Sequence, residues 1–144
     1  MKTLLHLMKD VTPRVDDAVI HRGDYFRLLF QQAPAACVVT NSACIVIDAN
    51  RAAETILLWP LSLMREQPFQ HMVGIADREI FDTMAADMLL HSFDASRPLC
   101  MKPQVGEEID VLFKARTIRS PDGTPEFISW VFFEALGSGS PDLV

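Results

Sequence analysis

The chain has 144 residues, of which 49% are hydrophobic and 22% are charged. A chain of this length and composition can bury one continuous core, which favours a single folded domain and excludes an intrinsically disordered one. Its formal net charge of -6 opposes contact with phosphate backbones, so we expect no direct nucleic-acid binding. The longest internal apolar run, residues 56–61, is far shorter than the roughly 20 residues that span a bilayer. We therefore expect a cytoplasmic protein that does not enter the membrane.

The three cysteines, Cys37, Cys44 and Cys100, lie in apolar surroundings and form no Cys-x-x-Cys pair. This pattern is typical of buried, reduced thiols in a cytosolic protein. Cys37 and Cys44 are placed to approach each other across an expected hairpin, but a metal ion would need two further ligands. No metal site is predicted.

The first 32 residues are predicted to be helical, in two pieces separated near Pro13. Apolar residues in the second piece fall on one stripe that needs a partner surface, either the domain's own sheet or the same helix of a second subunit. Periodicity does not separate these two outcomes, and we expect a homodimer through this stripe. The stripe consists of Val15, Val19, Phe26, Leu29 and Phe30.

Two apolar runs, residues 36–40 and 44–48, flank a polar turn and predict a β-hairpin. A short helix over residues 51–58 is expected to open after Asp48 or Asn50 and to end before Pro60. A looser stretch follows to about residue 76. The clearest helix covers residues 78–92 with Asp77 as its N-cap. Its apolar face is expected to contain Ile80, Phe81, Met84, Ala85, Met88 and Leu89.

Three strands are expected in the last third of the chain, around residues 99–101, at 109–118 and at 127–134. The turn between the last two, residues 120–124, contains Pro121 and Gly123, which favour a tight turn. An antiparallel sheet whose helices are concentrated in the middle of the chain indicates an α+β fold, because parallel units would require alternation throughout. Residues 136–144 are linker-like in composition.

Residues 25–34, 48–54, 67–69 and 73–78, together with the turns at Gly106 and Asp122-Gly123, resemble the PAS (Per-Arnt-Sim) sensory domain family. The resemblance covers about residues 25–135 and implies a five-stranded antiparallel sheet with short helices on one face. Residues 1–24 then form an N-terminal helical flank, and residues 136–144 a flexible tail or linker. The sequence departs from the family pattern at Ala43-Cys44, at Leu58-Trp59 and at Glu66, where glycine is usual, and this puts the turn geometry in question.

The resemblance implies a non-enzymatic signal-sensing and dimerisation module of the bacterial type. Such domains usually precede histidine kinases of two-component systems, cyclic-dinucleotide enzymes or transcription regulators. An output domain or a partner kinase or regulator is therefore expected. No cofactor is predicted, because residues 78–88 offer neither an axial histidine nor the cysteine of the photoactive flavin branch, and His91 comes late. Haem with a methionine ligand and non-covalent flavin stay open.

Methionine and aromatic side chains are expected to line the space between the long helix and the sheet. They either fill the core or border a pocket for a small apolar ligand, such as a fatty or aromatic acid. These candidate ligand-binding residues are Met72, Phe81, Met84, Met88, Phe113, Trp130 and Phe132. Ser129 and Arg116 are candidate polar anchors.

Two rival functions remain open from the sequence. One is a purely structural interaction and dimerisation domain with a filled core. The other is a small α+β isomerase or lyase, which would need a buried carboxylate as its base, and Asp110 is the candidate. No nucleophile elbow or phosphate-binding loop is present in the sequence, so no catalytic residue is assigned.

Overall fold

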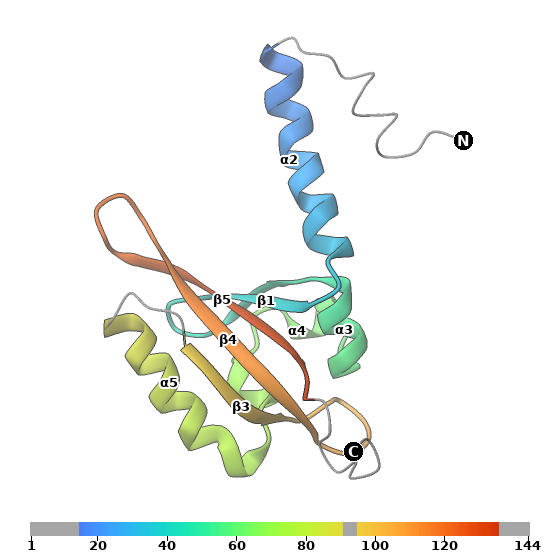
Figure 1. The fold of residues 1–144 in the computed structure, drawn as a ribbon, viewed down its shortest axis with the longest axis vertical. Coiled ribbons are helices and arrows are strands. Elements are labelled where there is room, and N and C mark those ends of the chain that lie inside the picture. Colours follow the sequence, from blue (N-terminus) through green and yellow to red (C-terminus); the bar gives the residue numbers. More distant parts are fainter. Residues whose placement is uncertain (1–14, 91–94, 136–144) are drawn as a thin grey trace.

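The computed structural model describes residues 15–90 and 95–135 (Figure 1). Three expected features lie outside the described residues: the helical piece before Pro13, His91, and the linker of residues 136–144. So do the side chains of Val15 and Val19, although their backbone belongs to a helix. No helix in the described ranges is both long and apolar enough to cross a membrane.

Five antiparallel strands form one sheet in the order β2-β1-β5-β4-β3. They are β1 (Ala36–Asn41), β2 (Val46–Ala49), β3 (Ala95–Met101), β4 (Ile109–Arg119) and β5 (Pro125–Glu134). The first and last strands of the sequence are therefore neighbours at the centre of the sheet. Each expected strand is present, and the fold class is the predicted α+β arrangement.

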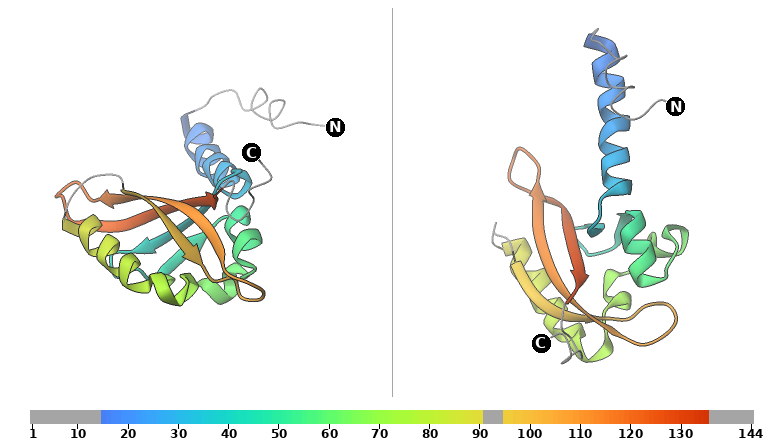
Figure 2. Two further views of the ribbon diagram at one scale, coloured as in Figure 1. Left: turned by 60° about the horizontal axis from the view of Figure 1, so that its bottom comes forward. Right: turned by 45° about the vertical axis from the view of Figure 1, so that its right-hand side comes forward.

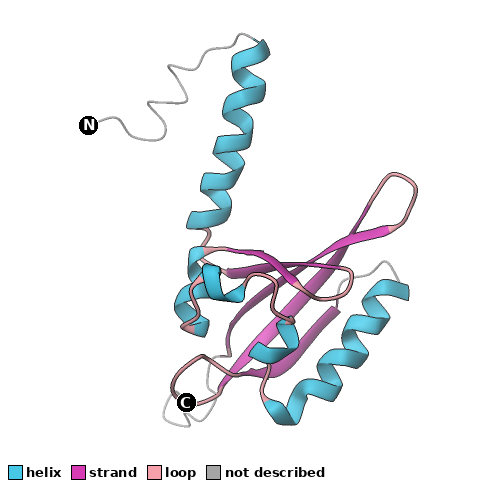
Figure 3. Ribbon diagram, turned by 180° about the vertical axis from the view of Figure 1, so that it is seen from behind, coloured by secondary structure: helices cyan, strands magenta, loops and turns pink. Residues whose placement is uncertain are grey.

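The helices between β2 and β3 pack on one face of the sheet (Figures 1 and 3). They are α3 (Arg51–Leu57), α4 (Leu61–Met64), the 3-10 turns η1 (Phe69–Met72) and η2 (Ile75–Asp77), and α5 (Arg78–Leu90). The stretch expected to be loose thus holds one short helix and two turns. It is fixed to β2 by hydrogen bonds from Glu66 N to Val46 O and from Val46 N to Gln67 O, both 2.9 Å.

Helix α5 presents Phe81, Met84, Ala85 and Met88 to the core, as expected. Ile80 departs from the prediction, since it is 44% exposed. Its sequence spacing places Ile80 beside the apolar face, but the buried residues of α5 all lie to one side of it. The face that packs on the core is therefore narrower than the spacing predicts. Asp77 was expected to cap this helix, and in the structure its carboxylate accepts a hydrogen bond from Cys100 N at 2.8 Å. It therefore links the start of α5 to β3.

Helix α2 (Val15–Gln32) stands away from the sheet and is the most projecting element of the described chain (Figures 1 and 2). It continues without a break across residue 24, the expected boundary between flank and domain. The C-terminal end of α2 leads into β1 after three residues, and α2 contacts α3.

Candidate functional site

The seven candidate ligand-binding residues converge in the core between the helices and the sheet. Met72 comes from η1, three residues come from α5, and the remainder come from β4 and β5. None of the seven is more than 2% exposed. The structure therefore brings together all the side chains that the sequence analysis selected, without itself showing a ligand among them.

Phe69 is a central core residue that the sequence analysis did not include among its candidates. Its ring lies 5.6–6.4 Å, centroid to centroid, from the rings of four other core aromatics. These are Phe81, Phe113, Trp130 and Phe132. Phe69 belongs to a single 3-10 turn, so no helical or strand period marks it. The Gln67-Pro68-Phe69 segment of the PAS resemblance was the available signal.

Polar groups are scarce in this core. Among the described residues, the buried polar side chains are Thr40 and Asn50. Trp130 donates its indole N–H to Thr40 Oγ1 at 3.0 Å, and Thr40 donates to Asn41 O at 3.0 Å. These bonds satisfy the indole nitrogen, which would otherwise carry the cost of an unpaired buried donor. The core is accordingly suited to an apolar occupant rather than a charged one.

Ser129 and Arg116, expected as polar anchors, lie on the opposite face of the sheet. Ile128 and Trp130 point into the core, so the alternation of β5 turns Ser129 outward. The Ser129 hydroxyl lies 3.6 Å from Cys37 Sγ. Arg116 pairs in register with Ser129 and is exposed. Neither side chain reaches the space between α5 and the sheet.

The expected dimerisation stripe is partly exposed where it is described. Phe26 is 58% and Leu29 44% exposed, whereas Phe30 is half-buried. The outer face of the sheet also carries exposed apolar side chains: Ile118, Phe127 and Phe133 are 38–44% exposed. Among the described residues, exposed apolar side chains therefore occur both on α2 and on the outer face of the sheet.

A scan of protein-family models and a search of curated protein sequences found no match. Solved structures do match. A PAS domain from Colwellia psychrerythraea has a TM-score of 0.75 at 14% identity, covering 81% of this chain and 99% of that one. A PAS domain of a LuxR-family transcriptional regulator from Burkholderia thailandensis, in complex with ethanol, gives 0.62 at 17% identity, covering 78% and 98%. A domain of a sensory box sensor histidine kinase/response regulator from Geobacter sulfurreducens gives 0.65 at 13%, covering 78% and 95%.

This chain has the PAS fold. The coverage shows that the likeness extends over the sheet and helices together and not over an isolated hairpin.

The three departures from the PAS pattern coincide with the positions of unusual backbone conformation. Cys44, Leu58 and Glu66 have φ values of 64°, 54° and 67°. They are the non-glycine residues with positive φ in the described chain. The left-handed region disfavours residues with a Cβ atom by about 1–2 kcal/mol. Each of these residues therefore takes a left-handed conformation that glycine would adopt without this cost.

The three cysteines of this PAS fold are free and half-buried, less buried than expected. Desolvation raises the pKa of Cys44 to about 11 and that of Cys100 to about 12, where a hydrogen bond to Glu108 at 3.1 Å adds to the effect. Desolvation also raises the pKa of Cys37. All three are therefore thiols near neutral pH, and none has the thiolate character of a reactive cysteine.

Helix α5 contains neither histidine nor cysteine, and His91 falls outside the described residues. No group of three metal-ligating side chains occurs in the described part of the chain. Asp110, the candidate base of the isomerase alternative, is exposed and not buried in the core. The buried polar side chains of the described residues, Thr40 and Asn50, include no carboxylate.

Proposed function

We propose that this chain is the sensory and dimerisation module of a signal-transduction or transcription-regulatory protein. Its ligand is a small apolar molecule held between α5 and the sheet. The observation that supports this is the convergence of Met72, Met84 and Met88 with four aromatic side chains in one buried cluster. Methionine side chains are flexible and can rearrange around a guest. The fold neighbours named as a transcriptional regulator and a sensor kinase support an output partner of one of these kinds.

A ligand would have to displace side chains, because the rings of the cluster already contact one another. Phe81 and Trp130 lie 4.9 Å apart and Phe113 and Phe132 5.2 Å apart, centroid to centroid. This packing supports the rival function, an interaction domain whose core stays filled. In both cases the module dimerises through α2 and resides in the cytoplasm, which agrees with its free thiols.

Native mass spectrometry with an absorption spectrum of freshly purified protein is the first test. An adduct of bound mass, or a ligand-dependent rise in melting temperature with fatty and aromatic acids, supports the sensor. A ligand at about 100 times its Kd adds about 2.7 kcal/mol to the free energy of unfolding. A Soret or flavin band would instead identify a cofactor. A colourless protein that no acid stabilises supports the filled core.

A matched pair of variants locates the binding. Met84→Phe places a bulkier, stiffer side chain between α5 and the sheet and is expected to abolish the ligand-dependent shift. Met64→Phe makes the same change at another fully buried methionine, in α4, and is expected to preserve the shift. The shift is measured within each variant, so their different starting stabilities do not affect the comparison. Equal loss in both would contradict a ligand between α5 and the sheet.

A further inference from the structure

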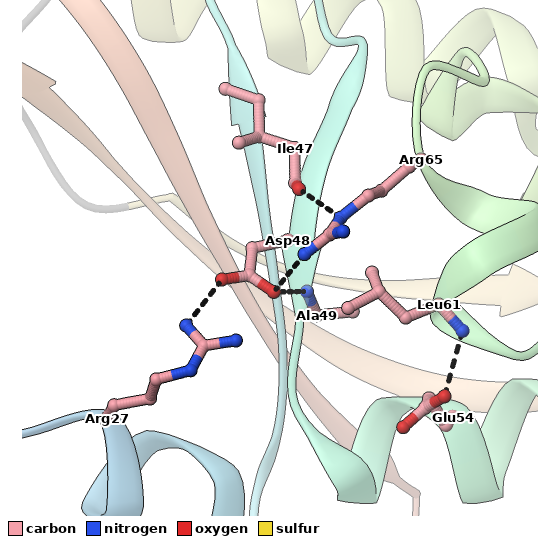
Figure 4. Close-up of polar contacts among 7 residues, drawn as sticks. All are labelled: Arg27, Ile47, Asp48, Ala49, Glu54, Leu61 and Arg65. Carbon is pink, nitrogen blue, oxygen red and sulfur yellow. Dashed lines mark hydrogen bonds and ion pairs between the residues drawn. The ribbon is translucent and has the colours of Figure 1, made fainter. Parts of the chain in front are cut away.

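The carboxylate of Asp48 lies between two arginines, one on the flanking helix α2 and one in the segment after α4 (Figure 4). Arg27 Nη1, on α2, lies 3.7 Å from Asp48 Oδ2. Arg65 is the first residue after α4, and its Nη2 atom lies 4.0 Å from Asp48 Oδ1. The same Oδ1 accepts a hydrogen bond from Ala49 N at 2.9 Å. One side chain on β2 therefore contacts both α2 and the segment between α4 and η1.

That segment leads directly to the centre of the core. Arg65 is held on β2 by a 3.3 Å bond from Nε to Ile47 O, and Glu66 follows it with a left-handed backbone. Phe69 comes four residues after Arg65, and its backbone N–H bonds to Cys44 O at 2.9 Å. Only three residues separate Arg65 from Phe69, and Glu66 N and Phe69 N both donate hydrogen bonds to the β1-β2 hairpin that carries Asp48.

We propose that Asp48 couples the packing of Phe69 in the core to the orientation of α2. The proposal rests on the proposed sensory function, for which it supplies the route from core to flanking helix. When Phe69 moves, Arg65 moves relative to the Asp48 carboxylate, and this changes the hold of Asp48 on Arg27. Both arginines are more than half exposed, at 59% and 52%. Exposed ion pairs of this kind contribute little free energy. They can therefore shift the populations of two orientations of α2 reversibly, but they cannot fix one orientation.

The test measures the distance between spin labels on α2 and on the sheet by pulsed electron paramagnetic resonance. The labels replace Asp24 and Glu126, both exposed, and labelled protein is diluted with unlabelled protein so that the distance is within one chain. The native cysteines are first removed by Cys37→Ser, Cys44→Gly and Cys100→Ser. Circular dichroism checks that this background is folded.

Phe69→Leu perturbs the core without removing its apolar character. With Asp48 present, it is expected to change the ratio of the α2 distance populations about two- to fivefold, the range for an exposed ion pair. With Asp48→Asn added, Phe69→Leu is expected to leave that ratio unchanged. Glu54→Gln is the matched control, because the Glu54 carboxylate, on α3, accepts a hydrogen bond from Leu61 N at the start of α4 and, within the described chain, forms no hydrogen bond or ion pair with Asp48 or either arginine (Figure 4).

An equal response to Phe69→Leu with and without Asp48→Asn would overturn the proposal, as would an unchanged distribution in Asp48→Asn alone. If Phe69→Leu does not fold, Arg65→Gln breaks the same link from the surface and is expected to shift the same populations. No ligand is used in this experiment. If the protein shows this coupling but binds no ligand, the proposed role of Asp48 stands and the proposed sensory function fails. If it binds a ligand but shows no coupling, the sensory function stands and the role of Asp48 fails.

Discussion

Leu58 is the residue at which side chain and backbone disagree most clearly. It has a left-handed conformation at the end of α3, and its side chain is 49% exposed. Neither burial nor backbone preference explains a leucine here. Glycine at this position would remove the left-handed penalty of about 1–2 kcal/mol. It would also make the unfolded chain more flexible, which lowers the gain in the free energy of unfolding by about 0.4–1 kcal/mol.

We therefore expect Leu58→Gly to be more stable than Leu58→Ala by about 0.5–1 kcal/mol, measured by urea denaturation. The two variants lose nearly the same side chain, so their difference reports the backbone. Leu63 provides the control: it is equally exposed but lies inside α4. There alanine should be more stable than glycine by about 1 kcal/mol. The same order of stability at both positions would show that Leu58 carries no backbone strain.

At the scale of elements, Asn50 joins the start of β1 to α3. Its Oδ1 accepts from Cys37 N at 2.9 Å and from Ala53 N at 3.0 Å, and its Nδ2 donates to Ala35 O at 2.9 Å. Asn50 is fully buried, so water cannot replace these partners. It fixes the point at which α2 passes into the sheet.

Asn50→Ala is expected to lower the free energy of unfolding by roughly 3 kcal/mol, because it removes a helix cap and leaves buried groups unpaired. Asn41→Ala is the matched control. The Asn41 carboxamide also accepts two backbone N–H groups, from Ala43 and Ile45, but in a partly exposed turn. Its loss should cost about 1 kcal/mol, because water takes over the freed groups. Comparable losses in chemical denaturation would contradict the structural role given to Asn50.

The elements that the sequence predicted well are those defined by local signals. The β1-β2 and β4-β5 hairpins follow from their turn residues, and the side of α5 that faces the core follows from apolar spacing. The segment around Phe69 has no such period, because its conformation is set by bonds to β2 such as Glu66 N to Val46 O. The direction of Ser129 could not be predicted either, since β5 is apolar on both faces at Val131 and Phe132. Partner surfaces depend on exposure, which only the assembled fold provides.

At the scale of the whole molecule, helix α2 and the outer face of the sheet carry exposed apolar side chains among the described residues. Figures 1 and 2 show α2 projecting away from the sheet. Phe26 is the most exposed of the large apolar side chains described on this helix. Exposed apolar surface of this kind usually marks an interface. A homodimer would bury Phe26 twice, once from each subunit, so a single substitution acts twice on the dimer.

Phe26→Asp is therefore expected to raise the dimer dissociation constant at least about a hundredfold, measured by sedimentation equilibrium. Burial of one phenylalanine contributes about 1.5–3 kcal/mol, and two copies contribute about 3–6 kcal/mol. Ile75→Asp is the control, because Ile75 is 70% exposed and lies in η2, away from α2. That variant should dimerise like the parent, and circular dichroism should show both variants folded. A dimer that tolerates Phe26→Asp would remove α2 from the interface and leave the outer face of the sheet, with Phe127 and Phe133, as the surface to be tested next.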